Sequence, residues 1–252
     1  MKLMSGKTHS DENFPVSSFI IKKKIRHYVR TFYFFARTAD DIADHENLKP
    51  SEKTKILNFF DKIIKKEKHT NVNVLNDLIK LFKEVPFGKK YSRELLKAFL
   101  MDASKKNYKN WEELENYCKF SANPVGRFVI DLVDKKERKN FHTNAIYKAS
   151  DNLCTSLQII NHLQDCQIDY LKLKRVYIPD SFFKKYSISK KSLELKISCK
   201  SFKSLINDIV EKIEIMLDDS VDGLKKISST RLRLETLIIL NIAKRLCNLL
   251  KK

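Results

Sequence analysis

Glycine and proline are scarce in this chain, with four and five residues among 252, while hydrophobic residues make up 42%. A fold that alternates strands and helices needs a turn residue at almost every strand end. This scarcity, together with long stretches of helical periodicity, predicts an all-α protein. Because neither an internal repeat nor a composition shift interrupts the chain, we expect residues 1–252 to form a single domain.

Several targeting and cofactor signals are also missing. The N-terminus lacks the apolar core of a signal peptide, and no uncharged apolar run approaches the roughly 20 residues of a membrane span. No glycine-rich nucleotide loop is present, so a reductive step with NADPH has no visible binding element. The five cysteines are dispersed without a C-x-x-C pair, which indicates reduced thiols. We therefore expect a cytoplasmic location.

Acidic residues are too few to balance the basic ones, and the formal net charge is +19. Such a charge favours an acidic partner or reflects a lysine-rich composition. The lysines are scattered along the whole chain, and no nucleic-acid-binding motif accompanies them. We therefore expect no nucleic-acid partner, whereas peripheral contact with the inner membrane face remains open beside the compositional explanation.

Helical periodicity predicts a series of helices joined by short loops. Ser51 and Ser92 are candidate N-caps for two of them. In the stretch "ANPVG", Pro124 and Gly126 predict a kink in the helix that begins at Trp111. The expected helices cover residues 20–44, a segment from 51, 74–85, a segment from 92, 111–133, 144–170, 201–224 and 229–250.

The stretch "FYFFARTADDIADHENL", residues 32–48, places aspartates directly after an aromatic run. At about 100° per residue, Tyr33, Arg37, Asp40 and Asp44 fall on one narrow stripe of a helix. Like charges four residues apart cost a few tenths of a kcal/mol, and aspartate is a poor helix former. This local penalty indicates a functional site, because a cation between the carboxylates would reverse the sign of their interaction.

A second polar stripe follows the long helix expected in the second half of the chain. Gln158, Asn161, Asp165 and Asp169 recur at intervals of three, four and four residues on an otherwise apolar helix. In a helical bundle, two such stripes can face each other across a central cavity. Their oxygen ligands suit Mg²⁺, which takes a few carboxylates together with waters and substrate phosphates. His162 lies off the stripe, which disfavours zinc.

An aromatic wall next to a Mg²⁺–diphosphate site has a chemical meaning. When diphosphate leaves an allylic carbon, the remaining carbocation needs a dry pocket and the negative faces of aromatic rings. We therefore interpret the two aspartate stripes as the binding site for a diphosphate head group. The aromatic run is interpreted as the housing for its isoprenoid chain.

These residues resemble the squalene/phytoene synthase family of head-to-head prenyl synthases. "ARTADDIAD" is similar to the first aspartate-rich motif of the family and "NHLQDCQIDYLKLKRVYIP" to its second, within a similarity that covers residues 12–180. Head-to-tail prenyl synthases share D-D-x-x-D but lack the second arrangement. "DENFPVSS" and "YCKFSANPVGR" most resemble the bacterial branch that converts presqualene diphosphate to hydroxysqualene in squalene and hopanoid synthesis.

The resemblance implies an all-α isoprenoid-synthase bundle around a central cavity, a Mg²⁺ cofactor, and presqualene diphosphate or farnesyl diphosphate as the substrate. Transferred by motif, the catalytic aspartates and the metal ligands are Asp40, Asp44, Asn161, Asp165 and Asp169. The resemblance also implies substrate-binding roles, with a diphosphate contact from Arg37, cavity-lining positions for Tyr33, Tyr117 and Gln158, and closure of the site by Arg175 and Tyr177.

Two departures from the family pattern stand near the second motif. Gln164 occupies a position where the family commonly has arginine, and the segment after Asp169 is one residue longer than usual, so Lys174 and Arg175 both remain candidates for the family's basic position. Asp41 has no assigned role, and Asp102 is either a buried partner in the channel or a solvent-facing residue.

Alternative functions also stay open. Within the family they are synthases of presqualene diphosphate, dehydrosqualene or phytoene. Two non-catalytic alternatives also remain. One is a scaffold protein that retains the fold, and the other is a basic membrane-binding module.

Overall fold

The computed structural model describes residues 23–137, 143–195 and 199–251, and throughout these ranges the regular structure is helical. The all-α prediction is therefore confirmed, since the described residues hold no strand beyond an isolated bridge between Asn107 and Val176. The first six helices are α1 (Lys23–Asp44), α2 (Pro50–Lys66), α3 (Asn73–Glu84), α4 (Gly88–Ser104), α5 (Trp111–Ser121) and α6 (Asn123–Glu137). They are followed by α7 (Asn144–Gln164), α8 (Cys166–Ile168), the π-helical η1 (Asp169–Leu173), α9 (Asp180–Lys185), the 3₁₀-helical η2 (Lys190–Glu194), α10 (Lys200–Lys225) and α11 (Thr230–Leu250).

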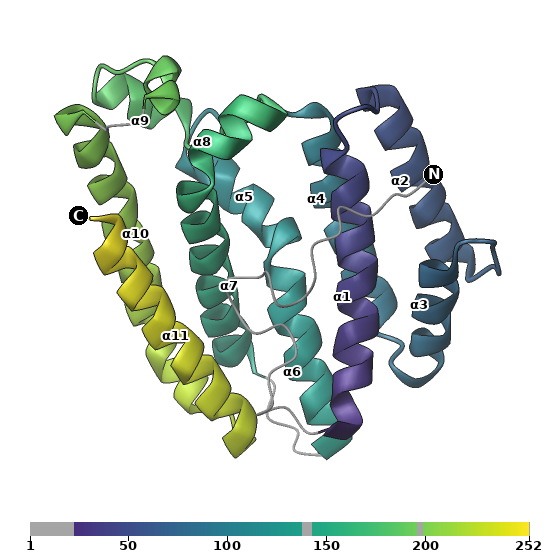
Figure 1. The fold of residues 1–252 in the computed structure, drawn as a ribbon. Helices are drawn as coiled ribbons and strands as arrows, with labels where there is room; N and C mark the ends of the chain where they lie inside the picture. The colour runs from purple at the N-terminus through teal and green to yellow at the C-terminus, as the bar shows by residue number, and fades with distance from the viewer. Residues whose placement is uncertain (1–22, 138–142, 196–198, 252) are drawn as a thin grey trace.

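The long helices stand side by side as a bundle (Figure 1). Helix α7 packs against α5, α6, α10 and α11, whereas α1 packs against α2, α3, α4 and α6. A continuous core of buried apolar side chains fills the spaces between these helices, and it includes Phe35, Ile42 and Phe128. Phe32 and Phe35 of the aromatic run therefore face the interior, whereas Phe34 is 52% exposed, and the aspartates after the run lie at the C-terminal end of α1.

The two serines expected to cap helices do not do so. Helix α2 begins at Pro50 after Lys49, whose backbone N–H donates to the Glu52 carboxylate at 2.8 Å. Proline suits this first position because its missing N–H would have had no intrahelical partner. Ser92 lies inside α4, where its hydroxyl donates to the Gly88 carbonyl at 2.8 Å.

The expected kink at "ANPVG" is confirmed as a full break between two helices. Helix α5 ends at Ser121 and α6 begins at Asn123. Gly126 then allows α6 to approach α7 closely, since a Cβ atom there would lie 2.4 Å from the Ser150 hydroxyl and 2.6 Å from the Cys154 sulfur. A side chain at position 126 would therefore require Ser150 and Cys154 to shift.

The helix expected over residues 144–170 is wrong beyond Gln164. Helix α7 ends at Gln164 with Asp165 as its C-cap, and the chain continues through α8 and the π turn η1, which Lys174 terminates in the left-handed region with φ 52°. After the π turn, the segment from Val176 to Ile178 lies in the core, where it is buried.

The expected first helix starts near residue 20, and the stretch "DENFPVSS" covers residues 11–18. Both the beginning of that helix and the whole of that stretch lie outside the described residues.

Candidate active site

Arg175 joins the first aspartate motif to the segment that follows the second. Its guanidinium is 2% exposed and donates to the Asp44 carboxylate at 2.9 Å and to the Asp102 backbone carbonyl at 2.8 Å. Lys174 is exposed on the other side of the turn. Arg175 therefore occupies the inward basic position, which connects the ends of α1 and α4 with the turn after η1.

Asp102 is a buried partner of this arginine and does not face solvent. Its carboxylate accepts hydrogen bonds from the hydroxyls of Tyr117 at 2.7 Å and Tyr177 at 2.8 Å, and it lies 3.6 Å from Arg175. Tyr108 packs its ring against both tyrosines at centroid distances of 5.4 and 5.5 Å. The structure thus holds Tyr117 and Tyr177 beneath the head-group region, the name used here for the predicted diphosphate site around Asp40, Asp44, Asp165 and Asp169. Tyr117 was expected on the cavity wall, but its hydroxyl is turned to Asp102.

Arg37 lies between two aspartates of the first motif. Its guanidinium contacts Asp40 at 3.1 Å and Asp41 at 2.8 Å. The Asp41 side chain is only 5% exposed, whereas that of Asp40 is 36% exposed. Asp41 therefore anchors the arginine from the interior, and this gives a structural role to the aspartate that the motif left without one.

Crowded carboxylates raise one another's pKa at this end of the bundle. The pKa of Asp40 is raised above its ordinary value by the partial burial of the carboxyl and by the facing Asp44 carboxylate. Burial raises the pKa of Asp169 to about 7, with further contributions from Asp165 and from Asp44 of the first motif. The two motifs therefore share one electrostatic field, in which a bound cation would stabilise every ionised carboxylate.

The pKa of Asp102 is also raised, to about 6, because burial outweighs the nearby Arg175.

In metal-free protein we expect Asp102 and Asp169 to lower the free energy of unfolding as the pH rises between about 5 and about 7. In this window the folded state holds protons that the unfolded state has already released, so raising the pH removes a stabilising difference. Denaturant titrations at several pH values measure it. Asp102→Asn should show a flatter dependence than the wild type, and an unchanged slope would contradict the assignment.

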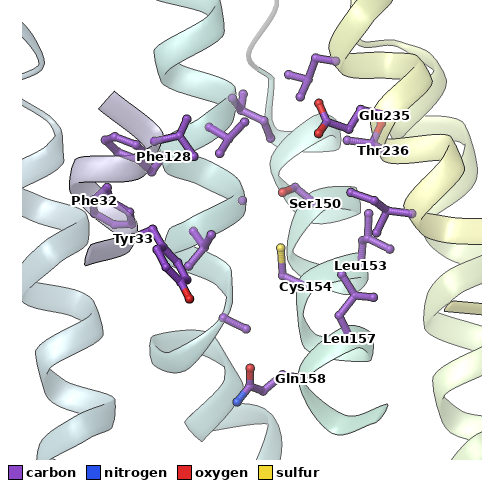
Figure 2. Close-up of a pocket in the computed structure, with 18 of the residues that line it drawn as sticks. Phe32, Tyr33, Phe128, Ser150, Leu153, Cys154, Leu157, Gln158, Glu235 and Thr236 are labelled. Carbon is purple, nitrogen blue, oxygen red and sulfur yellow. The ribbon is translucent and has the colours of Figure 1, made fainter. Parts of the chain in front are cut away.

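A cavity of about 340 Å³ runs between α1, α6, α7 and α11. Figure 2 shows Phe32, Tyr33 and Phe128 on one wall and Leu153 and Leu157 on the other. Gln158 and Asn161 also line the cavity, as Tyr33 does, so three of the predicted substrate-binding residues contribute to its lining. The lining is mostly apolar, which suits a hydrocarbon chain.

His162 fixes the orientation of Gln158 at the cavity wall. The His162 ring stacks on Tyr177 at a centroid distance of 3.5 Å, and its Nε2 lies 3.1 Å from the Gln158 amide nitrogen. Burial lowers the pKa of His162 to about 3, so the ring is neutral at physiological pH and accepts this hydrogen bond. The side-chain carbonyl oxygen of Gln158 is then available to accept a hydrogen bond inside the cavity.

Two lysines near the head-group region were not singled out by the sequence. Lys53 donates to the Ala43 carbonyl at 2.8 Å, and Lys106 donates to the Leu173 carbonyl at 3.2 Å. Burial and the neighbouring cations lower the pKa of both ammonium groups. No sequence signal distinguishes them, because lysine is common along the whole chain.

A divalent metal fits this site only together with a bound ligand that supplies further oxygen atoms. Among the residues that the structure describes, no three His, Cys, Asp or Glu side chains converge to hold an ion by themselves. The two carboxylate pairs nevertheless interact across the site, since Asp44 raises the pKa of Asp169. Mg²⁺ commonly binds through one or two carboxylates plus substrate phosphates, and diphosphate oxygens would complete the shell here. The individual ligand roles stay predictions.

Known proteins match this fold and this sequence over nearly the whole chain. The family model described as squalene/phytoene synthase matches residues 7–252. The hydroxysqualene synthase of Sinorhizobium fredii is 35% identical over 247 residues, which are 98% of this chain and 82% of the relative. That of Rhodopseudomonas palustris is 36% identical over 99% of this chain and 83% of the relative.

Solved structures share the fold at lower identity. The squalene synthase HpnC of Alicyclobacillus acidocaldarius superposes with a TM-score of 0.80 at 22% identity, over 96% of this chain and 89% of that one. A dehydrosqualene synthase in complex with a ligand gives 0.74 at 21% identity, over 92% and 78%. These structures share the all-α fold, and the family match and the relatives at 35–36% identity identify an isoprenoid synthase. The chain belongs to the squalene/phytoene synthase family, as its two aspartate motifs predict.

Proposed function

We propose that this protein is a Mg²⁺-dependent enzyme that converts presqualene diphosphate to hydroxysqualene in squalene and hopanoid synthesis. The main support is the junction of the two aspartate motifs through Arg175, next to a cavity with aromatic walls. The relatives named hydroxysqualene synthase, at 35–36% identity over nearly the whole chain, support this product over others of the family.

The reaction begins when the carbon–oxygen bond of presqualene diphosphate, at the carbon attached to the cyclopropane ring, breaks and its electron pair leaves with diphosphate. Arg37, held by Asp41, offers positive charge to the leaving group, and Arg175 holds Asp44 in place next to it. Bound Mg²⁺ would add positive charge against the leaving oxygens. We propose that its ligands are Asp40, Asp44, Asn161, Asp165 and Asp169.

The carbocation that remains is stabilised by the residues of the cavity. The faces of Phe32 and Tyr33 stabilise positive charge, and the apolar wall excludes bulk water until rearrangement is complete. One water then adds through its oxygen to the rearranged cation and gives up a proton to the released diphosphate, which yields a neutral alcohol. Gln158, oriented by His162, is a polar wall group able to hold that water.

The test incubates purified protein and Mg²⁺ separately with presqualene diphosphate, farnesyl diphosphate and geranylgeranyl diphosphate, and products are identified by mass spectrometry. Hydroxysqualene from presqualene diphosphate alone supports the proposal. Turnover of farnesyl or geranylgeranyl diphosphate alone would assign the protein to another branch of the family. No turnover of any of the three would favour the scaffold.

We also propose that the protein contacts the inner membrane face peripherally. Among the described helices, none combines the length and the apolar character needed to cross a bilayer. On α11, however, Leu234, Ile238 and Ile242 are 51%, 48% and 36% exposed and lie on one stripe. Exposed Arg231 and Arg245 fall on the same side of the helix, a combination that suits an anionic lipid surface.

Vesicle co-sedimentation tests this contact. The wild type should pellet with phosphatidylglycerol-containing vesicles at low salt and be released at high salt, since screening weakens the attraction. Ile238→Glu should lower the bound fraction several-fold, whereas Ile215→Glu on α10 serves as the exposed apolar control. A wild type that stays in the supernatant at low salt would overturn the proposed contact.

A further inference from the structure

Two lysine side chains lie at the head-group region, and no step of the proposed reaction uses them. Lys53 of α2 is 8% exposed, and Lys106, in the loop between α4 and α5, is half-buried. Such lysines are uncommon, because removal of an ammonium group from water is costly. Lys53 donates to the Ala43 carbonyl in the last turn of α1. Lys106 donates to the Leu173 carbonyl at the end of η1, so both side chains are fixed in place.

The two lysines belong to a cluster of three cations next to Asp44. The backbone N–H of Val176 donates to the Lys106 carbonyl at 2.9 Å, which places Lys106 beside Arg175 in the neighbouring segment. Burial lowers the pKa of both ammonium groups, Arg175 lowers it further, and the Asp44 carboxylate raises it. In the described part of the chain, neither lysine forms an ion pair with a carboxylate. Basic groups from three separate segments therefore meet at one end of the first aspartate motif.

Each ammonium group keeps donors for a ligand. It carries three N–H groups, and its hydrogen bond to a backbone carbonyl occupies one of them. A cluster of like charges is unfavourable unless an anion neutralises it. The diphosphate that leaves in the proposed reaction is such an anion, and it carries one more negative charge than the ester because it keeps the electron pair of the broken bond. Cations next to it therefore stabilise the transition state more than the bound substrate.

We propose that Lys53 and Lys106 form a cationic subsite that binds the oxygens of the diphosphate group directly, while the buried Arg175 adds its charge from within the protein. This inference rests on the proposed function and deepens it by adding two residues that bind the leaving group. The aspartates attract an anion only after Mg²⁺ has bound to them, whereas the lysines attract it by their own charge. The subsite therefore predicts diphosphate binding that survives removal of the metal.

Calorimetry with inorganic diphosphate in the presence of EDTA and at low ionic strength tests the subsite, because it needs neither metal nor turnover. The wild type should bind one diphosphate per chain. Lys53→Met and Lys106→Met should each weaken this binding by about tenfold, the loss expected for one hydrogen bond between charged groups. Lys106→Arg should retain most of it because the charge stays. Asp169→Ala should not weaken it, since a carboxylate without its metal only repels the anion.

Lys80→Met is the matched control, since it removes the same charge from α3, where the side chain is 74% exposed, and it should leave the dissociation constant unchanged. Should Lys53→Met fail to fold, Lys106→Met still tests the subsite, because its carbonyl partner ends a short turn and not a long helix. No saturable binding by the metal-free wild type, or an unchanged dissociation constant in the methionine variants, would overturn the subsite and leave the proposed function standing. Metal-free binding by a protein that turns over none of the three prenyl diphosphates with Mg²⁺ would support the subsite and overturn the proposed function.

Discussion

Alanine at Asp40, Asp44, Asp165 or Asp169, introduced one at a time, should reduce turnover of the prenyl diphosphate by about 10³-fold or more. Metal-assisted stabilisation of a leaving group is worth several kcal/mol, and each 1.36 kcal/mol corresponds to a factor of ten in rate. The loss should appear chiefly in kcat, because the metal acts on charge that develops in the transition state. Pyrophosphate release at saturating substrate measures it.

Asp77→Ala is the matched control for these variants. Asp77 lies on α3 with a side chain that is 61% exposed, and its ion pair with Lys80 at 3.5 Å is a surface contact. This variant should retain full activity and an unchanged requirement for Mg²⁺. A motif variant that keeps activity within tenfold of the wild type, while its thermal unfolding is unchanged, would remove that aspartate from the proposed site.

Arg175→Gln should destabilise the protein by about 3–5 kcal/mol, which is the usual cost of removing one partner of a buried ion pair. The substitution leaves Asp102 buried without its cation and releases Asp44 from its contact. The effect should be largest above pH 7, where Asp102 is ionised, and smaller near pH 5, where its raised pKa allows it to take up a proton. Denaturant unfolding at both pH values measures the difference.

Tyr177→Phe controls for the loss of hydrogen bonding alone. It removes the hydroxyl that donates to Asp102 at 2.8 Å but keeps the ring that stacks on His162. We expect a loss of about 1 kcal/mol from this variant. If Arg175→Gln costs no more than Tyr177→Phe at both pH values, the buried network is not held together by charge.

Periodicity predicted the helices well, because it depends on local sequence, and the first aspartate stripe lies on α1 as its spacing predicted. The break at "ANPVG" was visible in Pro124 and Gly126 for the same reason. The end of α7 was not visible in the sequence, since the spacing from Gln158 to Asp169 fits a continuous helix equally well. Beyond that end the chain brings Arg175 back to Asp44 across 131 residues, a tertiary contact that periodicity does not encode.

The roles of several polar residues likewise depended on long-range contacts. Asp41 appeared as the odd member of its motif, and only the structure shows it paired with Arg37. Lys53 and Lys106 were hidden by the abundance of lysine. Charge partners that come from different helices require the fold before they can be assigned.

The central claim is that both aspartate motifs hold one Mg²⁺–diphosphate group between them. A crystal structure with Mn²⁺ in place of Mg²⁺ and the unreactive farnesyl thio-diphosphate tests it most directly, because manganese is located by its anomalous scattering. We expect metal peaks that share diphosphate oxygens and lie about 2.0–2.3 Å from carboxylate oxygens of both Asp40 or Asp44 and Asp165 or Asp169. Metal on only one motif, or diphosphate bound elsewhere in the cavity, would contradict the account.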